Sequence, residues 1–310
     1  YRVLVKARWA RGAIDFETLE TQMVFDEQGK IARIVPVSRN DAHRIIEECM
    51  LAANVCASDF LHENEHPALY RIHEGPTPEK LVKLREFLKE FGLQLTGGDE
   101  PHAKDYAKLL EKVKGRPDMQ LLQTVMLRSL KQAMYSPDNV GHFGLAYESY
   151  THFTSPIRRY PDLVIHRAIK AVLQGGKYRP GNWEEIGIHC SQTERRADEA
   201  TRDVESWLKC YYMQDRIGEE FDGSVSAVTS FGIFVALDDV FVEGLVHISD
   251  LGSDYFHFDA AKHQLLGERS GQRFRLADRV RVQLVRVDME SSKIDFRLTG
   301  EVGGQGRRRV

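Results

Sequence analysis

The sequence changes in character at Gly218, and this change limits the possible fold more than any other feature. Before it, apolar residues recur at the three- and four-residue spacing of helices over several long segments. After it, short runs of Val, Ile and Phe alternate with Gly, Ser and Asp, as in a small β-barrel. The fold class predicted is therefore mixed α+β. We expect domains at 1–217 and 218–300 and a flexible basic tail at 301–310.

The first part predicts a short helix and a hairpin, followed by a series of helices. The hairpin falls within 1–37 around the turn DEQG, and a strong helix covers about 41–62 with Ser38 and Asp41 at its start. The residues that recur at helical spacing in that helix, and so predict its apolar face, are Ile45, Ile46, Cys49, Ala53, Cys56 and Phe60. Further helices are expected at 78–91, 102–114, 118–134, 161–173 and from Ser191 to Gly218.

Composition excludes some classes of protein. The net charge is −3, so a nucleic-acid site has to be a local patch and not a property of the whole surface. The four cysteines form no C-x-x-C pair, which favours a reduced cytoplasmic setting over a cysteine-built metal site. We expect neither a signal peptide nor a membrane span. Because the chain opens on Tyr1 and not on Met, we expect a piece of a longer protein.

The segment HENEH, residues 62–66, matches the zinc-protease pattern H-E-x-x-H. A working site needs both histidines on one face of a helix and a third ligand. Here the motif lies where Pro67 ends the helix, and no third ligand is near in the sequence. A zinc hydrolase built on His62 and His66 is thus a distant alternative, and a solvated helix end is the favoured interpretation.

The stretch 142–167, HFGLAYESYTHFTSPIRRYPDLVIHR, indicates a functional site more strongly than the zinc motif does. Arg158 and Arg159 precede a helix that Pro161 would begin, and the N-terminus of a helix attracts anions. Two guanidinium groups there suit a phosphate, and rings around them suit the bases of single-stranded nucleic acid. The rings are those of Tyr147, Tyr150, His152, Phe153 and Tyr160. The alternative is an arginine pair that is salt-bridged to carboxylates beside core aromatics.

The segment YTHFTSPIRRYPDLVIHR resembles the signature of the ribonuclease II and ribonuclease R family of exoribonucleases. Two further segments are similar to the same family and occur in the same order: NDAHRIIEECMLAANVCASDFL and ALYRIHEGP. Their residues are more similar to those of ribonuclease R than to those of ribonuclease II. The resemblance spans nearly the whole chain. It implies part of an RNB catalytic domain, with helices packed on a sheet, and hydrolysis of single-stranded RNA from its 3′ end to nucleoside 5′-monophosphates.

The resemblance also implies roles for single residues. Arg158 matches the family's arginine that holds the scissile phosphate, where its charge stabilises the transition state. Arg159, Tyr150 and His152 become candidate RNA contacts beside it. Phe16, in RGAIDF, matches a phenylalanine that stacks on bases near the 3′ end, although an ordinary core phenylalanine is the alternative.

One family feature has no counterpart in the sequence. The family holds magnesium, its implied cofactor, with an aspartate cluster that lies upstream of the segment matching RGAIDF. The adjacent Asp238 and Asp239 lie in the predicted barrel, where a solvated turn is expected. We therefore predict no metal ligand in this chain, and we expect the chain alone to bind RNA better than it cuts it.

The C-terminal part resembles an OB-type, five-stranded RNA-binding barrel over GSVSAVTSFGIFVALDDVFVEGLVHISDL and GQRFRLADRVRVQLVRVDMESSKIDFRLTG. This resemblance implies an RNA platform of Phe231, Phe234 and His247, with Lys293 as a basic contact. Strand alternation would separate the two phenylalanines, so we predict a bulge at Gly232. The alternatives are that one phenylalanine fills the core and that His247 is a plain surface histidine.

The sequence thus predicts a cytoplasmic 3′-to-5′ exoribonuclease, present as its C-terminal part. The expected partners are single-stranded RNA, the missing N-terminal part of the enzyme, and ribosomes or RNA-rescue factors; we expect a monomer. The alternative from another class is a single-stranded RNA-binding protein that does not cut.

Overall fold

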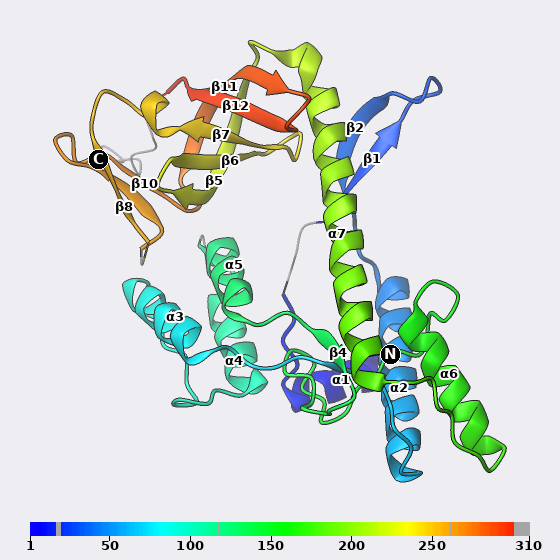
Figure 1. Cartoon of the computed structure of the whole chain (residues 1–310). Coiled ribbons are helices and arrows are strands. Elements are labelled where there is room, and N and C mark those ends of the chain that lie inside the picture. The colour runs from blue at the N-terminus through cyan, green and yellow to red at the C-terminus, as the bar shows by residue number, and fades with distance from the viewer. Residues whose placement is uncertain (17–19, 117, 261, 301–310) are drawn as a thin grey trace. The chain divides into compact units, whose positions relative to one another are not determined.

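The computed structural model describes residues 1–16, 20–116, 118–260 and 262–300 (Figure 1). The chain forms two compact units, which are described separately. The first combines Tyr1–Glu17 with Ser38–Asp198, and the second combines Thr18–Val37 with Glu199–Val310. The predicted basic tail at 301–310 lies outside the described residues.

The first unit is mainly helical. Its helices are α1 (Arg2–Arg11), α2 (Asp41–Glu63), α3 (Pro78–Glu90), α4 (Ala103–Val113), α5 (Met119–Ser129), α6 (Tyr160–Leu173) and the first part of α7 (Trp183–Met213). The described strands in this unit are β3 (Tyr70–Ile72) and β4 (Met134–Ser136), which pair antiparallel. The sheet on which helices were expected to pack is thus a short two-stranded ribbon.

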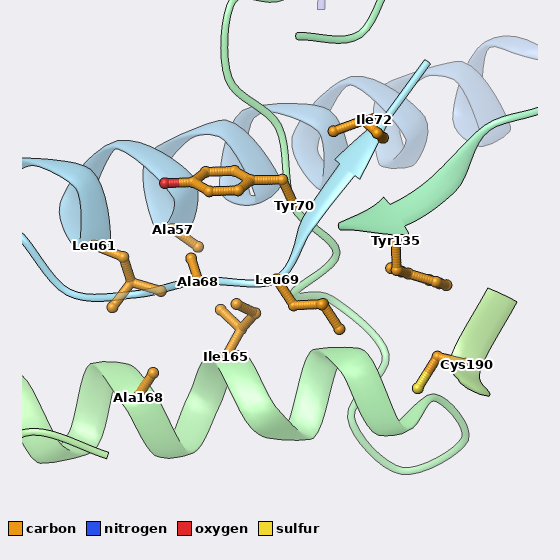
Figure 2. Packing of buried hydrophobic residues seen from close by; sticks show 10 residues of the cluster. All are labelled: Ala57, Leu61, Ala68, Leu69, Tyr70, Ile72, Tyr135, Ile165, Ala168 and Cys190. Carbon is orange, nitrogen blue, oxygen red and sulfur yellow. The ribbon is translucent and has the colours of Figure 1, made fainter. Parts of the chain in front are cut away.

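A compact apolar core joins this ribbon to the helices around it (Figure 2). Leu61 of α2 points toward α6, and Ile165 of α6 points toward Leu69, which directly precedes β3; all three side chains are fully buried. The other members of the cluster are Ala57, Ala68, Tyr70, Ile72, Tyr135, Ala168 and Cys190. Burial of apolar surface on this scale fixes α2, α6 and the ribbon relative to one another. The loop that joins β4 to α6 is therefore held at both ends.

The predicted apolar face of α2 is wrong for most of its residues, although Phe60 packs against the core. Ile46 is 59% exposed, whereas Leu51 and Leu61 face the core together with the buried polar residues Asn54 and Ser58. The polar residues obscure the inward face in the sequence, because each needs a hydrogen-bond partner that lies far away along the chain. The helix is also capped by Asn40, whose side chain accepts from the backbone of Ala42 and His43, and not by Ser38 or Asp41.

The other helices agree with expectation where local signals are strong. Thr77 caps α3, and Pro161 lies in the first turn of α6. The helix expected at 118–134 ends at Ser129, before β4 begins. The long helix α7 begins at Trp183 and not at Ser191. The hydroxyl of Ser191 donates to the carbonyl of Gly187 and accepts from the backbone of Tyr135, so it does not cap a helix.

The second unit contains the hairpin and the barrel. The hairpin pairs β1 (Thr21–Phe25) with β2 (Ile31–Pro36), as predicted. A closed five-stranded barrel has the order β11-β12-β7-β6-β5, and β12 runs parallel to β7 (Figure 1). Its strands are β5 (Glu220–Thr229), β6 (Gly232–Leu237), β7 (Glu243–His247), β11 (Arg279–Asp288) and β12 (Lys293–Leu298).

A second sheet lies between β7 and β11 in the sequence. It has the order β10-β9-β8 and is built from β8 (Phe256–Asp259), β9 (Gln264–Gly267) and β10 (Arg273–Arg275). Short 3-10 helices cover Gln214–Arg216 and Ile248–Asp250. The mixed α+β class and the five-stranded barrel are thereby confirmed. Across the described ranges, no helix has both the length and the apolar character that a membrane crossing requires.

Candidate functional site

The segment 150–159 is fixed by contacts with α2, with α6 and with Leu69, which directly precedes β3. The side-chain amide of Asn54, in α2, donates to the hydroxyl of Tyr150 at 2.8 Å and accepts from the backbone of Phe153 at 2.9 Å. The hydroxyl of Thr151 donates to the carbonyl of Leu69 at 2.7 Å. The ring of Phe153 stacks on His166 of α6 with centroids 4.1 Å apart. The backbone that leads to the arginine pair is therefore rigidly placed.

The two arginines of the predicted pair have different environments. The carboxylate of Asp162, in the first turn of α6, is fully buried and accepts from the guanidinium of Arg159 and from the backbone of Ser155, both at 2.7 Å. Arg159 is half-buried and is engaged in this ion pair. Arg158 is exposed, and its backbone donates to the carbonyl of Ser155. The alternative of a salt-bridged arginine thus applies to Arg159, while Arg158 presents its side chain to solvent.

Of the rings predicted to surround the pair, those of Tyr150 and His152 are structural, whereas Tyr160 is 48% exposed. Tyr150 is 5% exposed, its hydroxyl accepts from Asn54, and its ring packs beside those of Tyr147 and His152. It offers no open face to a base in this structure. Nδ1 of His152 lies 2.8 Å from the hydroxyl of Tyr135. Burial, reinforced by repulsion from Arg159 and Arg71, lowers the pKa of His152 to about 2, so this ring is neutral.

A cavity of about 1270 Å³ opens in the same unit, and Arg158 does not line it. Its lining includes Arg11, His73, Asp105, His142, Phe143 and Tyr147. The guanidinium carbon of Arg11 lies 3.9 Å from the ring centroid of Tyr147, and its Nε donates to the carbonyl of Leu145. Burial lowers the pKa of His142 to about 3, with a further contribution from His73. Sequence reasoning missed Arg11, although it directly precedes the quoted glycine of RGAIDF.

Phe16 is half-buried and follows α1. A stacking role for this ring stays a prediction.

The platform residues of the barrel gather at one end of β6 and β7. The rings of Phe231 and Phe234 are 6.1 Å apart and nearly perpendicular, and Phe231 is 46% exposed. His247 is exposed at the end of β7, where it pairs with Gly232. The proximity of the three predicted residues follows from this register.

The predicted bulge at Gly232 is wrong. The irregularity in the β5–β6 pairing lies between Val225 and Ala227, and Gly232 pairs regularly with His247. Phe231 instead belongs to the turn that precedes β6, so strand alternation does not apply to it. Gly232 has a φ of +152°, and a Cβ there would lie 2.3 Å from the carbonyl oxygen of Val246. The glycine is thus needed for a tight turn and a close approach of two strands.

Lys293 is exposed at the start of β12, away from this end of the platform. The parallel pairing aligns Asp295 with Leu245, so Lys293 lies two residues before that level and His247 two residues after it. Four residues of strand correspond to about 13 Å. The structure therefore does not bring Lys293 and His247 together.

The zinc motif is not assembled. Helix α2 ends at Glu63, so His66 lies beyond it, while His62 is exposed in its last turn. His66 is 3% exposed, and its two ring nitrogens lie 2.7 Å from the carbonyl of Pro67 and 2.9 Å from the backbone nitrogen of Tyr178. The interpretation as a solvated helix end was wrong for His66, which is a buried structural residue.

Asp238, in the turn after β6, forms a salt bridge with Arg279.

The implied magnesium ion would need a cluster of oxygen ligands. Within the residues that the structure describes, no three His, Cys, Asp or Glu side chains come together as metal ligands. Magnesium is held mainly by carboxylate oxygens. The described residues therefore do not fit a resident magnesium site.

Comparisons with known proteins agree with the two-part architecture. The RNB domain family matches residues 1–175, and the S1 RNA binding domain family matches residues 214–298. Ribonuclease R of Escherichia coli is 52% identical over 96% of this chain and 38% of its own length. Ribonuclease R of Vibrio cholerae is 49% identical over 99% of this chain and 40% of its own length. The chain thus spans about two fifths of the length of these relatives.

A solved structure gives the same assignment. Mycoplasma genitalium RNase R, in complex with ribose methylated single-stranded RNA, is 29% identical with a TM-score of 0.87. The alignment covers 96% of this chain and 48% of that one. The RNB match and the S1 match follow one another along the chain. The chain therefore belongs to the RNB-domain family that includes ribonuclease R, and its C-terminal barrel is an S1 RNA-binding domain.

Proposed function

We propose that this chain is the C-terminal part of a 3′-to-5′ exoribonuclease that hydrolyses single-stranded RNA processively to nucleoside 5′-monophosphates. The observation that carries the proposal is the exposed Arg158, which lies at the N-terminus of α6 next to the ion pair of half-buried Arg159 with buried Asp162. Membership of the RNB family and the length of the chain relative to ribonuclease R support it.

In this proposal Arg158 acts on the scissile phosphate. Its guanidinium group donates to the non-bridging oxygens and stabilises the negative charge that grows as water attacks phosphorus. The bond that breaks joins phosphorus to the 3′ oxygen of the shortened RNA, and the released nucleotide keeps the phosphate at its 5′ position. Arg159 and Asp162 position the loop, while Phe16 stacks on bases near the 3′ end.

The implied magnesium ions would activate the water and stabilise the leaving oxygen. Because the described residues do not fit a metal site, we assign no step of this chain to the metal. We propose that the aspartate ligands belong to another part of the enzyme, since the relatives are more than twice as long as this chain.

The barrel contributes binding in this proposal. The half-exposed ring of Phe231, together with Phe234 and His247, forms a surface on which bases stack without strong sequence preference. Its likeness to the S1 RNA binding domain supports this role. We further propose a cytoplasmic monomer that meets ribosomes or RNA-rescue factors, and the four free cysteines fit a reducing compartment.

The second candidate is a single-stranded RNA-binding protein without hydrolytic activity. The lack of an assembled metal-ligand cluster in the described residues favours it. The two proposals differ in whether the complete gene encodes an aspartate-rich block before Tyr1.

The test uses the protein encoded by the complete gene, with magnesium and a 5′-labelled single-stranded RNA. The exoribonuclease gives a ladder that shortens from the 3′ end; Arg158→Ala abolishes it, and Arg128→Ala, a change at another exposed arginine of the first unit, does not. The 310-residue chain alone binds the RNA without shortening it. Binding without any ladder from the complete protein supports the non-catalytic candidate, and a full-rate ladder from Arg158→Ala contradicts the assigned role.

A further inference from the structure

The register of the barrel brings a basic residue to the platform that sequence reasoning did not single out. Asp295 pairs with Leu245 and Phe296 with Val246 in the parallel β12–β7 ladder, so the next position along each strand holds Arg297 and His247. Neighbouring strands lie about 4.8 Å apart. Arg297 is thus one strand away from His247, as Figure 1 shows for the adjacent strands β12 and β7.

The burial pattern places both side chains on the outer surface of the barrel. Phe296 and Val246 are 1% and 0% exposed and fill the interior, whereas Arg297 and His247, the next residues, are exposed. Side chains alternate between the two faces of a strand, so the exposed pair points outward together. Gly232 pairs with His247 on the other side, directly after the exposed Phe231.

The charges around Arg297 leave its guanidinium available to a ligand. In β11, Arg281 forms an ion pair with Glu220, and Arg286 forms one with Asp288. Arg297 itself pairs with the neutral Gln283 in register. Over the parts of the chain that the structure covers, it has no carboxylate within ion-pair distance.

We propose that Arg297 is the phosphate contact of the barrel platform and binds the backbone of single-stranded RNA whose bases stack on Phe231 and Phe234. This inference rests on the proposed RNA-binding function and adds the residue that neutralises the phosphate. Arg297 lies one strand from His247 and two strands, about 10 Å, from β6, which carries Phe234. An arginine at that distance can grip a phosphate of a strand whose bases stack on the rings. Lys293, four residues of β12 away, lies at the other end of this surface.

The experiment measures fluorescence anisotropy of a short 5′-labelled oligouridylate with the 310-residue chain over a series of salt concentrations. Arg297→Ala weakens binding about fivefold and lowers the slope of log K against log salt by about 0.7, the value for one lost phosphate contact on a single strand. Arg297→Lys keeps most of the wild-type slope of log K against log salt, because the positive charge remains. Arg273→Ala, the matched control at an exposed arginine of the same unit, changes affinity less than twofold.

Two results overturn the inference and leave RNA binding intact: a larger loss in Lys293→Ala than in Arg297→Ala, or an Arg297→Ala variant with unchanged affinity and slope. If Phe231→Ala also has no effect, the barrel platform as a whole is not the RNA surface. A wild-type chain that binds no RNA even at low salt overturns the proposed function together with this inference. Unchanged thermal unfolding of each variant shows that the effects are local.

Discussion

Two adjacent arginines illustrate how far neighbouring residues can differ in environment. Arg159 is half-buried against the fully buried Asp162, and Arg158 is exposed one position earlier. Breaking the ion pair between Arg159 and the buried carboxylate of Asp162 would leave a buried charge without a partner, which costs free energy. Arg159 therefore stabilises the loop and is not available to a ligand. Arg158 keeps its donors for a ligand. The sequence pair RR therefore contains one positioning residue and one candidate catalytic residue.

Replacing Asp162 by Ala should destabilise the first unit strongly. The change leaves Arg159 and the backbone nitrogen of Ser155 without their acceptor, which costs about 3 kcal/mol in the free energy of unfolding. The decrease in the free energy of unfolding is measured by urea unfolding, with circular dichroism as the signal. Asp138→Ala, which removes an exposed carboxylate of the same unit, serves as the control. Equal stabilities of the two variants would show that the buried ion pair contributes nothing.

The neutral His152 should make the fold sensitive to acid. Burial lowers its pKa to about 2 in the folded chain, while an unfolded histidine titrates near 6.5. Below about pH 6.5 the unfolded state binds a proton that the folded state does not, so stability falls as the pH falls. The expected loss is about 1 kcal/mol per pH unit for this side chain.

The measurement compares the free energy of unfolding at pH 7.0 and 5.5. His152→Gln should show a smaller drop than the wild type by about 1 kcal/mol, and His62→Gln, at an exposed position, should behave as the wild type does. An identical drop in His152→Gln would mean that folding does not lower the pKa of this ring. His142, whose pKa is also lowered, to about 3, accounts for part of the remaining sensitivity.

At the scale of elements, a tight turn builds the barrel platform. Gly232 begins β6 with a positive φ and touches the β7 backbone so closely that no Cβ fits. This contact sets Phe231 beside Phe234 and brings His247 level with the turn. The geometry of one glycine therefore determines which side chains form the surface.

Gly232→Ala should disrupt this turn. Its Cβ meets the carbonyl oxygen of Val246, so strands β6 and β7 must separate at that end, and we expect a loss of about 3 kcal/mol. Gly252→Ala is a matched control, because Gly252 has a similar φ of +143° with no described atom closer than 4.0 Å to the added Cβ. Thermal unfolding of both variants separates the steric clash from the backbone strain. A loss in Gly232→Ala no greater than in Gly252→Ala contradicts the argument.

Local sequence signals predicted an element correctly where its position depends on residues that are close in the sequence. Thr77 and Pro161 located the starts of α3 and α6, and short alternating runs indicated the barrel. The inward face of α2 was not predictable in this way. Asn54 is buried because it bonds to Tyr150, 96 residues later, and no local pattern reports such a partner.

In the candidate site, too, some features were predictable from the sequence and others depend on tertiary structure. The resemblance implied a platform of Phe231, Phe234 and His247, and in the barrel these residues lie at the same end of β6 and β7. Their role in binding RNA stays a prediction. The motifs did not indicate that Tyr150 is buried or that Lys293 is remote from His247, because burial and strand register depend on tertiary pairing. Arg297 was missed for the same reason. Its proximity to His247 becomes visible only in the parallel ladder.

At the scale of the whole molecule, the chain combines two units with different candidate tasks. The first presents Arg158 on a rigid loop, and the second presents aromatic and basic groups on a closed barrel. Sequence-tolerant stacking and phosphate contacts both require unpaired bases and an accessible backbone. The proposed activity therefore requires a preference for single strands that the chain should retain without its metal site.

The most direct test measures the affinity of the 310-residue chain for a labelled RNA as a single strand and as a duplex with its complement, at one salt concentration without magnesium. We expect the single strand to bind at least about tenfold more tightly, because one lost stacking contact costs about 1–3 kcal/mol. Phe231→Ala should remove most of that preference. Equal affinity for the two forms, or no measurable binding, would contradict the assignment of this chain as the single-strand-binding part of an exoribonuclease.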